Sequence, residues 1–190
     1  LALTAAVAVG GTLAWLTAND SVQNTFTVGN IQMSMDEAPV DANGQATEGA
    51  RTDANTYHIV PGGSYDKDPT IHFNAGNDAS YLFVKVENGL EGIEANVDGK
   101  DTIEEQILAN GWAAVDDEEN VYYKAVSANT GAAAVDYVVF ENLYISETAS
   151  DLSAYADKTI TVTAYAIQQA GFESNVAGAW DAVQAAHPTV

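Results

Sequence analysis

The stretches at residues 159–168 (TITVTAYAIQ) and 81–87 (YLFVKVE) decide the fold. Both are rich in β-branched and aromatic residues, and in both the side chains alternate with a period of two. Helices differ, because their apolar residues recur every three to four positions. The two stretches therefore predict the central strands of a β-sheet.

Weaker strand signals lie on either side of these two. Residues 25–36 alternate in the same way but are interrupted by a Gly-Asn step, which indicates a bulge or a turn. Further strands are expected at 57–60, 70–73, 121–126 and 137–145. With the strand at the start, the count reaches about seven. Residues 36–56 are polar and contain several glycines, so they predict a long surface loop.

Two segments have helical spacing instead. In residues 101–110, Asp101 is the expected N-cap and Glu104 follows three residues later, close to a capping box. Ser174 is the expected cap of a last helix, whose apolar side chains are Val176, Trp180 and Val183. Many short strands with two short helices predict an all-β fold: a single antiparallel β-sandwich of jelly-roll or immunoglobulin-like type.

The charge balance excludes several classes of partner. The chain has 190 residues, 6 basic and 27 acidic, and a formal net charge of −21. So few cations cannot release counterions from nucleic acid, and an anionic membrane would repel the chain. Because 47% of the residues are hydrophobic, the composition is that of a folded protein. Cysteine is absent, which excludes disulfides and thiolate chemistry.

The first 16 residues carry no charge and are rich in Leu, Ala and Val. This pattern is typical of the apolar region of a secretory signal peptide, and it is shorter than the ~20 residues that span a bilayer. Thr12 and Ala14 supply the small residues that a cleavage site requires, so Trp15 is the expected first residue of the mature chain. Residues 1–14 are then a signal-peptide remnant and residues 15–190 the β-sandwich domain. The alternative is that the run is a strand or helix of the domain.

Residues that could carry chemistry are few. His58 and His72 lie on predicted neighbouring strands and could approach each other, but a zinc site needs a third ligand and no H-E-x-x-H motif occurs. The G-x-S-x-G signature of hydrolases is also absent. We therefore expect a protein that is not an enzyme, and the sequence assigns it no catalytic residues and no cofactor.

Two acidic loops are candidates for weak Ca²⁺ binding. One surrounds a D-A-N-G turn and offers Asp41, Asn43 and Glu48, and the other is the run at residues 116–120. Both are rich in the oxygen ligands that Ca²⁺ prefers, yet neither has the spacing of an EF-hand. The alternative interpretation is that they are solvated, mutually repelling loops.

After cleavage, residues 15–28 would form an apolar N-terminal segment. Its large apolar side chains alternate with polar ones and are those of Trp15, Leu16, Val22, Phe26 and Val28. Such a segment can pair with its own sheet or add a strand to the open edge of a neighbouring molecule. Repeated head to tail, the second arrangement does not close and produces a filament. The alternative is an ordinary first strand of a monomer.

Several segments together resemble the TasA/camelysin family of Gram-positive bacteria, in particular a clostridial branch. The junction between signal peptide and mature chain resembles that of signal peptides processed by a SipW-type peptidase, at residues 10–17 (GGTLAWLT) and 24–31 (NTFTVGNI). The other segments are 59–65 (IVPGGSY), 67–71 (KDPTI), 81–86 (YLFVKV), 110–112 (NGW), 138–142 (VVFEN) and 160–168 (ITVTAYAIQ).

The resemblance implies a secreted jelly-roll subunit of extracellular biofilm matrix fibres. Each subunit would insert its N-terminal strand, residues 15–28, into the next, with Phe26 and Val28 as anchors. The partners are then other copies of the same chain, together with matrix or cell-wall components; the mature form has no membrane partner. Camelysin is described as a metallopeptidase, which gives one alternative function. A monomeric adhesin or carbohydrate-binding module, with Trp112 and Trp180 as exposed stacking platforms, is another.

Overall fold

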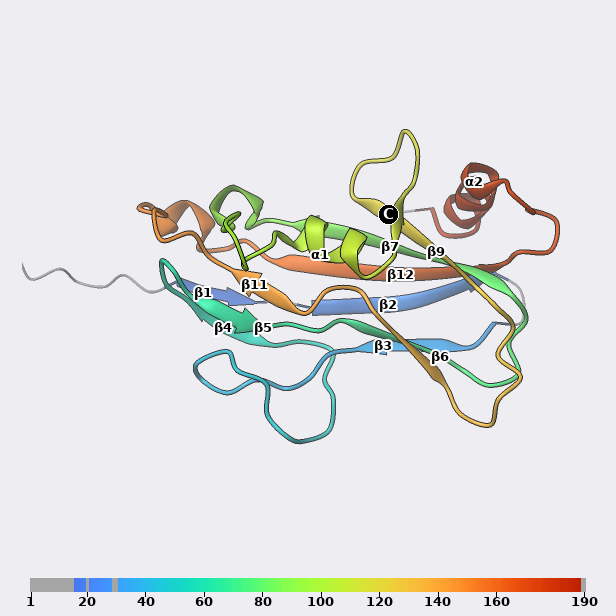
Figure 1. The fold of residues 1–190 in the computed structure, drawn as a ribbon, viewed down its shortest axis with the longest axis horizontal. Coiled ribbons are helices and arrows are strands. Elements are labelled where there is room, and N and C mark those ends of the chain that lie inside the picture. Colours follow the sequence, from blue (N-terminus) through green and yellow to red (C-terminus); the bar gives the residue numbers. More distant parts are fainter. Residues whose placement is uncertain (1–15, 20, 29–30, 189–190) are drawn as a thin grey trace, which may run out of the picture.

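Two layers of β-strands face each other across the hydrophobic core (Figure 1). The computed structural model describes residues 16–19, 21–28 and 31–188; before residue 28 it describes the backbone alone. The larger layer is a five-stranded sheet in the order β2 (Ser21–Val28), β12 (Ile160–Gln168), β7 (Ser80–Asn88), β9 (Val121–Val126) and β8 (Ala113–Ala114). The predicted signal remnant, residues 1–14, and Trp15 lie outside the described residues.

The facing layer is built from shorter strands (Figure 1). One sheet has the order β10 (Val135–Val138), β6 (Thr70–Phe73) and β3 (Met33–Asp36), and two strand pairs join β1 (Leu16–Asn19) to β4 (Thr56–Ile59) and β11 (Asn142–Tyr144) to β5 (Ser64–Asp66). All these pairs are antiparallel. The structure thus confirms the expected all-β, sandwich-like fold.

The predicted strand at 137–145 is two strands. β10 pairs with β6, and β11 pairs with β5. Between β5 and β6 lies Pro69, which has no N–H to donate to a ladder, and its carbonyl instead accepts a hydrogen bond from the N–H of Val139. The break between β5 and β6 therefore lies opposite the break between β10 and β11. β1, β5 and β8 are too short to have shown a periodic signal.

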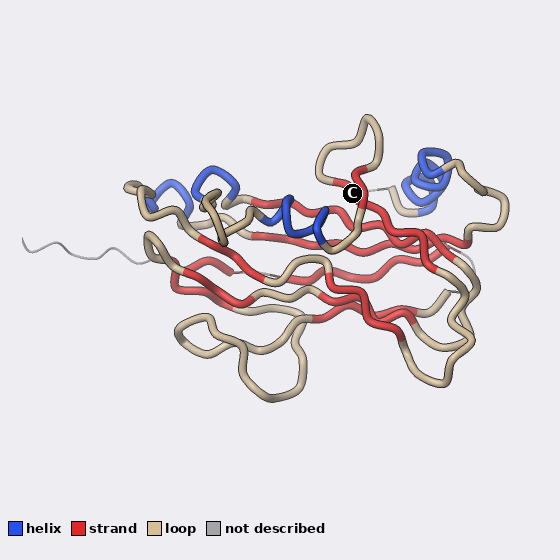
Figure 2. Tube along the Cα trace, in the orientation of Figure 1, coloured by secondary structure: helices blue, strands red, loops and turns tan. Residues whose placement is uncertain are grey.

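The described residues also form two α-helices and two short 3₁₀ segments: α1 (Ile103–Ala109), α2 (Val176–Ala186), η1 (Glu91–Ile93) and η2 (Leu152–Tyr155). Figure 2 shows them at the periphery of the strand layers. The expected caps were wrong by one residue in each α-helix. Thr102, not Asp101, caps α1 through a capping box with Glu105, and Asn175 caps α2 by accepting a hydrogen bond from the N–H of Gly178. No helix among the described residues has both the length and the apolar character needed to cross a membrane.

The core has two parts because β7 and β12 are buried on both faces. Side chains on one face, including Leu82 and Val84 of β7, fill the space between the two layers. Those on the other face, including Phe83 of β7 and Tyr165 of β12, pack beneath α2 around Trp180. α2 therefore stabilises the sheet by covering an aromatic face that would otherwise be exposed to water.

Candidate functional site

The N-terminal segment, residues 16–28, forms two strands that belong to different sheets. β1 pairs with β4, and β2 runs along β12 from Ser21 opposite Thr161 to Val28 opposite Ile167. The β2–β12 pair is parallel, and the register shifts after Thr163. It is thus an exception to the expected antiparallel pairing. A parallel pair needs no tight turn, and these strands are far apart in the sequence.

This segment contains the predicted assembly residues. Leu16 lies in β1, and Val22 and Phe26 lie in β2; the structure describes their backbone. Val28, the last residue of β2, is half-buried and packs against the aromatic cluster around Trp180. β2 occupies the end of the five-stranded order, so β12 would become the edge of the sheet if β2 were removed. We call the β12 edge that β2 occupies the strand seat.

The first acidic loop has a structural explanation. The Asp41 carboxylate accepts hydrogen bonds from the backbone N–H groups of Asn43 and Gln45, at 2.8 and 3.0 Å. These bonds lower the pKa of Asp41. Gly44 follows with φ +74°, and an added Cβ there would lie 2.5 Å from the ring of Tyr65. The D-A-N-G sequence therefore builds a turn against Tyr65, while Glu48 is exposed to solvent.

The second acidic loop, residues 116–120, is a turn between β8 and β9, in which Asp117 and Asn120 have positive φ. Its residues Glu118, Glu119 and Asn120 line a shallow pocket together with Glu91 and Glu104. Among the described residues, no three acidic, histidine or cysteine side chains are grouped to hold a metal ion.

The two central histidines lie in different sheets and not on neighbouring strands as expected. His58 lies in β4, which pairs with β1, whereas His72 lies in β6, between β3 and β10. Sequence order suggested neighbouring strands, but β5 and its flanking turns separate the two in the chain and the strands join different sheets. The strand pairing on which the histidine metal-site hypothesis depended is therefore not formed.

Glu94 is the most perturbed carboxyl group, and the sequence did not indicate it. It lines a cavity of about 340 Å³ between β7, η1 and α1. Burial is the main cause that raises the pKa of Glu94 to about 7, and the nearby charges of Glu91 and Glu105 add to it. Hydrogen bonds from the N–H of Ile103 and from Asn88, both at 3.0 Å, partly oppose the rise. The folded chain thus holds this proton up to neutral pH.

We expect Glu94→Gln to raise the melting temperature at pH 8 and to have little effect at pH 5. Folding raises the pKa of this carboxyl group, so the unfolded state releases the proton at a lower pH than the folded state does. The free energy of unfolding therefore falls as the pH rises from about 4.5 to about 7. Above that range the buried charge costs on the order of 2 kcal/mol after solvent screening, or roughly 4–8 °C. Thermal unfolding followed by circular dichroism measures the difference; an equal shift at both pH values would contradict this origin.

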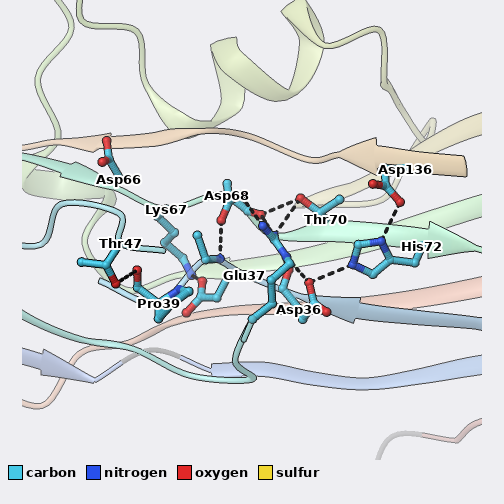
Figure 3. A network of polar contacts seen from close by, with 12 residues as sticks. Asp36, Glu37, Pro39, Thr47, Asp66, Lys67, Asp68, Thr70, His72 and Asp136 are labelled. Atoms are coloured by element: carbon cyan, nitrogen blue, oxygen red, sulfur yellow. Dashed lines mark hydrogen bonds and ion pairs between the residues drawn. The ribbon is translucent and has the colours of Figure 1, made fainter. Parts of the chain in front are cut away.

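A polar network crosses the β10–β6–β3 sheet at the base of the loop at residues 37–55 (Figure 3). Arg51 donates to the carboxylates of Asp36 and Asp68, the second at 2.9 Å. His72 lies between Asp36 and Asp136, with its ring nitrogens 2.8 and 2.6 Å from their oxygens. Asp36 joins the two halves of the network, because the same oxygen contacts both Arg51 and His72.

We expect His72→Gln to destabilise the fold more at pH 6 than at pH 8. Partial burial lowers the pKa of His72, but the hydrogen bonds and charges of Asp36 and Asp136 outweigh it and raise the pKa above 6.5. The charged ring therefore stabilises the fold fully below pH 6.5, and this contribution disappears as the pH rises through the folded pKa. The pairs are partly exposed, so the loss should be about 0.5–1 kcal/mol. Urea unfolding at the two pH values tests it; a loss that is larger at pH 8 would reverse the sign.

Beside this network lies an ion pair that is completely buried. Lys67 Nζ is 2.6 Å from Glu37 Oε2, and both side chains have 0% exposure. Lys67 also lies over the ring of Phe140, 5.8 Å from its centroid. The other carboxylate oxygen of Glu37 accepts a hydrogen bond from the amide of Asn55 at 2.8 Å. These side chains tie both ends of the loop at residues 37–55 to the body of the domain.

The tryptophans considered as stacking platforms are core residues. Trp112 is 3% exposed and Trp180 is 4% exposed. The indole of Trp112 donates to the carbonyl of Val138 at 2.9 Å, and Trp180 packs against Phe83 and Tyr165. The carbohydrate-binding alternative therefore loses the residues on which it depended. The chain matches no family model, no curated protein and no solved structure.

Proposed function

We propose that the protein is a secreted, non-enzymatic subunit of an extracellular matrix fibre, and that it assembles by exchanging its N-terminal segment between copies. One observation carries the proposal: β2 fills the strand seat as a parallel strand at the end of an otherwise antiparallel sheet. Parallel pairing is slightly less stable per residue than antiparallel pairing, so each residue of β2 is held less firmly than a residue of the antiparallel strands beside it. A second copy offers the same strand in the same register.

The attachment of the segment also favours exchange. Apart from their pairing with β4 and β12, the described strands β1 and β2 are joined to the rest of the domain through the chain segment between β2 and β3. Among the side chains that the structure describes, the sandwich core and the aromatic cluster consist of residues 31 onward together with Val28. Release of residues 16–28 would expose the strand seat to the segment of another molecule.

The charge of the chain sets the conditions for assembly. Subunits of net charge −21 repel one another, which keeps them soluble before they join. Salt, divalent cations or acid reduce this repulsion. Growth should therefore be faster at high ionic strength, or near pH 5, than in dilute buffer at pH 7.

Electron microscopy and light scattering of the purified chain from residue 15 onward test the proposal. We expect fibres, with growth promoted by salt or acid, and no fibres from a chain that begins at residue 29. Circular dichroism establishes whether the shorter chain is folded. Fibre growth that is fastest at low salt and neutral pH would contradict the role of charge. A soluble monomer that binds stoichiometric zinc and digests casein would instead support the peptidase alternative.

A further inference from the structure

One buried carboxylate contacts two nitrogen atoms of very different character. Glu37 Oε2 lies 2.6 Å from the amine of Lys67, and Glu37 Oε1 lies 2.8 Å from the side-chain amide nitrogen of Asn55. Glu37 directly follows β3, Lys67 lies between β5 and β6, and Asn55 directly precedes β4. Figure 3 shows Lys67 pointing toward Glu37. Three chain segments thus bring an amine, an acid and an amide together.

The contact between Lys67 Nζ and Glu37 Oε2 is short enough, at 2.6 Å, for a proton to pass between them. Lys67 and Glu37 are both fully buried. The free energy needed to remove two charges from water is often larger than the free energy gained from their attraction. Transfer of one proton from the ammonium to the carboxylate removes both charges. It leaves a neutral amine, the nucleophilic form of lysine, and a carboxylic acid that can give the proton away again.

The amide of Asn55 is held as an acceptor of such an attack. Its oxygen accepts a hydrogen bond from the N–H of Val40 at 3.2 Å, which would stabilise the negative charge that develops there. The side-chain nitrogen of Asn55 donates a hydrogen bond to Glu37. Glu37 is therefore placed to protonate this nitrogen, which must gain a proton before it can leave. Asn55 is half-buried, so a small leaving group can escape to solvent.

We propose that Lys67 and Asn55 join in an intramolecular amide bond, with Glu37 as the catalytic residue. The Lys67 ammonium gives a proton to Glu37, and the free amine attacks the side-chain carbonyl carbon of Asn55. The new C–N bond forms as the bond from that carbon to the amide nitrogen breaks. The nitrogen takes the proton from Glu37 and one further proton from the attacking amine, and it leaves as an ammonium ion, so the protein loses the mass of one ammonia. Glu37 returns to its starting state once the product amide is neutral, and no oxidant or other reactant is consumed.

Asn55 is favoured over Glu37 itself as the partner of Lys67. A Lys67–Glu37 amide would consume the carboxylate that contacts both nitrogen atoms, and it would release water instead of ammonia. The Lys67–Asn55 bond closes a loop through β4 and β5 and fixes the end of the loop at residues 37–55. It would lock this side of the sandwich whether or not the chain forms fibres.

Mass spectrometry of the folded, full-length protein tests the bond. We expect the intact mass to fall short of the sequence mass by one ammonia. A succinimide at any asparagine gives the same loss, so the position must be mapped after denaturation and trypsin digestion. The bond should block cleavage after Lys67 and yield one continuous peptide, residues 52–85, with a ring between Asn55 and Lys67 and a mass lower by one ammonia, in place of the peptides 52–67 and 68–85.

Three variants serve as controls. Asn55→Ala removes the acyl partner from a half-buried position, so it should fold, keep its full mass and be cleaved after Lys67; Glu37→Gln should also keep its full mass. Asn88→Ala alters an asparagine that donates to the partly buried Glu94, and this variant should still lose ammonia. The proposal is overturned by an unmodified wild-type mass, by ammonia loss that persists in Asn55→Ala, or by loss of water with the peptide that contains Glu37 cross-linked to Lys67.

Discussion

A disulfide between positions 23 and 163 is expected to stop fibre growth until it is reduced. Gln23 of β2 and Thr163 of β12 are partners across the parallel pair. Neighbouring strands lie about 4.8 Å apart, within the range of about 4.4–6.8 Å that a disulfide spans between Cα atoms. Because the chain contains no cysteine, Gln23→Cys/Thr163→Cys forms this bond without competing thiols. In the oxidised variant the disulfide holds β2 in its own strand seat. The reduced variant should assemble like the wild type.

The matched control is Lys85→Cys/Thr163→Cys. Lys85 is the partner of Thr163 on β7, so this bond joins two strands of the body and leaves β2 unrestrained. Light scattering with and without reductant should show loss of assembly only for the oxidised 23–163 pair. If both oxidised proteins form fibres at the wild-type rate, the segment does not leave its own sheet and strand exchange is wrong.

The second large effect is expected at the buried ion pair. Lys67→Met leaves Glu37 at 0% exposure without its cation, and breaking such a pair typically costs about 3–5 kcal/mol of unfolding free energy. For a chain of this length, the melting temperature should fall by roughly 10 °C. The double variant Lys67→Met/Glu37→Leu removes both charges and should recover most of the loss. Both variants also lose any amide bond from Lys67 to Asn55, so the difference between them measures the cost of leaving Glu37 buried without Lys67.

Lys85→Met provides the comparison. Lys85 is partly exposed and lies 3.8 Å from Glu87, so its replacement should change the stability by less than about 1 kcal/mol. Urea unfolding of the four proteins measures the differences. A Lys67→Met variant as stable as Lys85→Met would show that the buried pair contributes nothing to the fold.

Most of the larger sheet could be predicted from the sequence. β7, β9 and β12 are long enough for alternation to appear, and the structure places them side by side. Shorter strands such as β5 and β8 exist because a neighbour supplies hydrogen bonds, and a local pattern does not contain that information. The cap of α1 was wrong by one residue because Asp101-Thr102 and Glu104-Glu105 offer two registers of the same motif.

The buried chemistry could not be predicted, for a related reason. Glu37 and Asn55 lie at the two ends of a segment whose composition is that of a solvated loop. Only the tertiary fold shows that these ends return to Lys67. The chain has 27 acidic residues and 6 basic ones, so each lysine has many possible acidic partners. Their positions in the sequence do not show which of them lies beside it in the fold. Glu94 was missed likewise, since its burial depends on η1, β7 and α1 meeting.

The parallel pairing of β2 with β12 has a consequence for the concentration at which fibres form. An exchanged β2 makes the same hydrogen bonds with β12 of a neighbouring molecule as with β12 of its own chain, so joining gains little enthalpy per subunit. The home strand has an advantage, because a short connection to β3 gives it an effective concentration in the millimolar range. Dilute subunits should therefore stay closed on themselves, and growth should begin above a threshold concentration that a longer connection between β2 and β3 would lower.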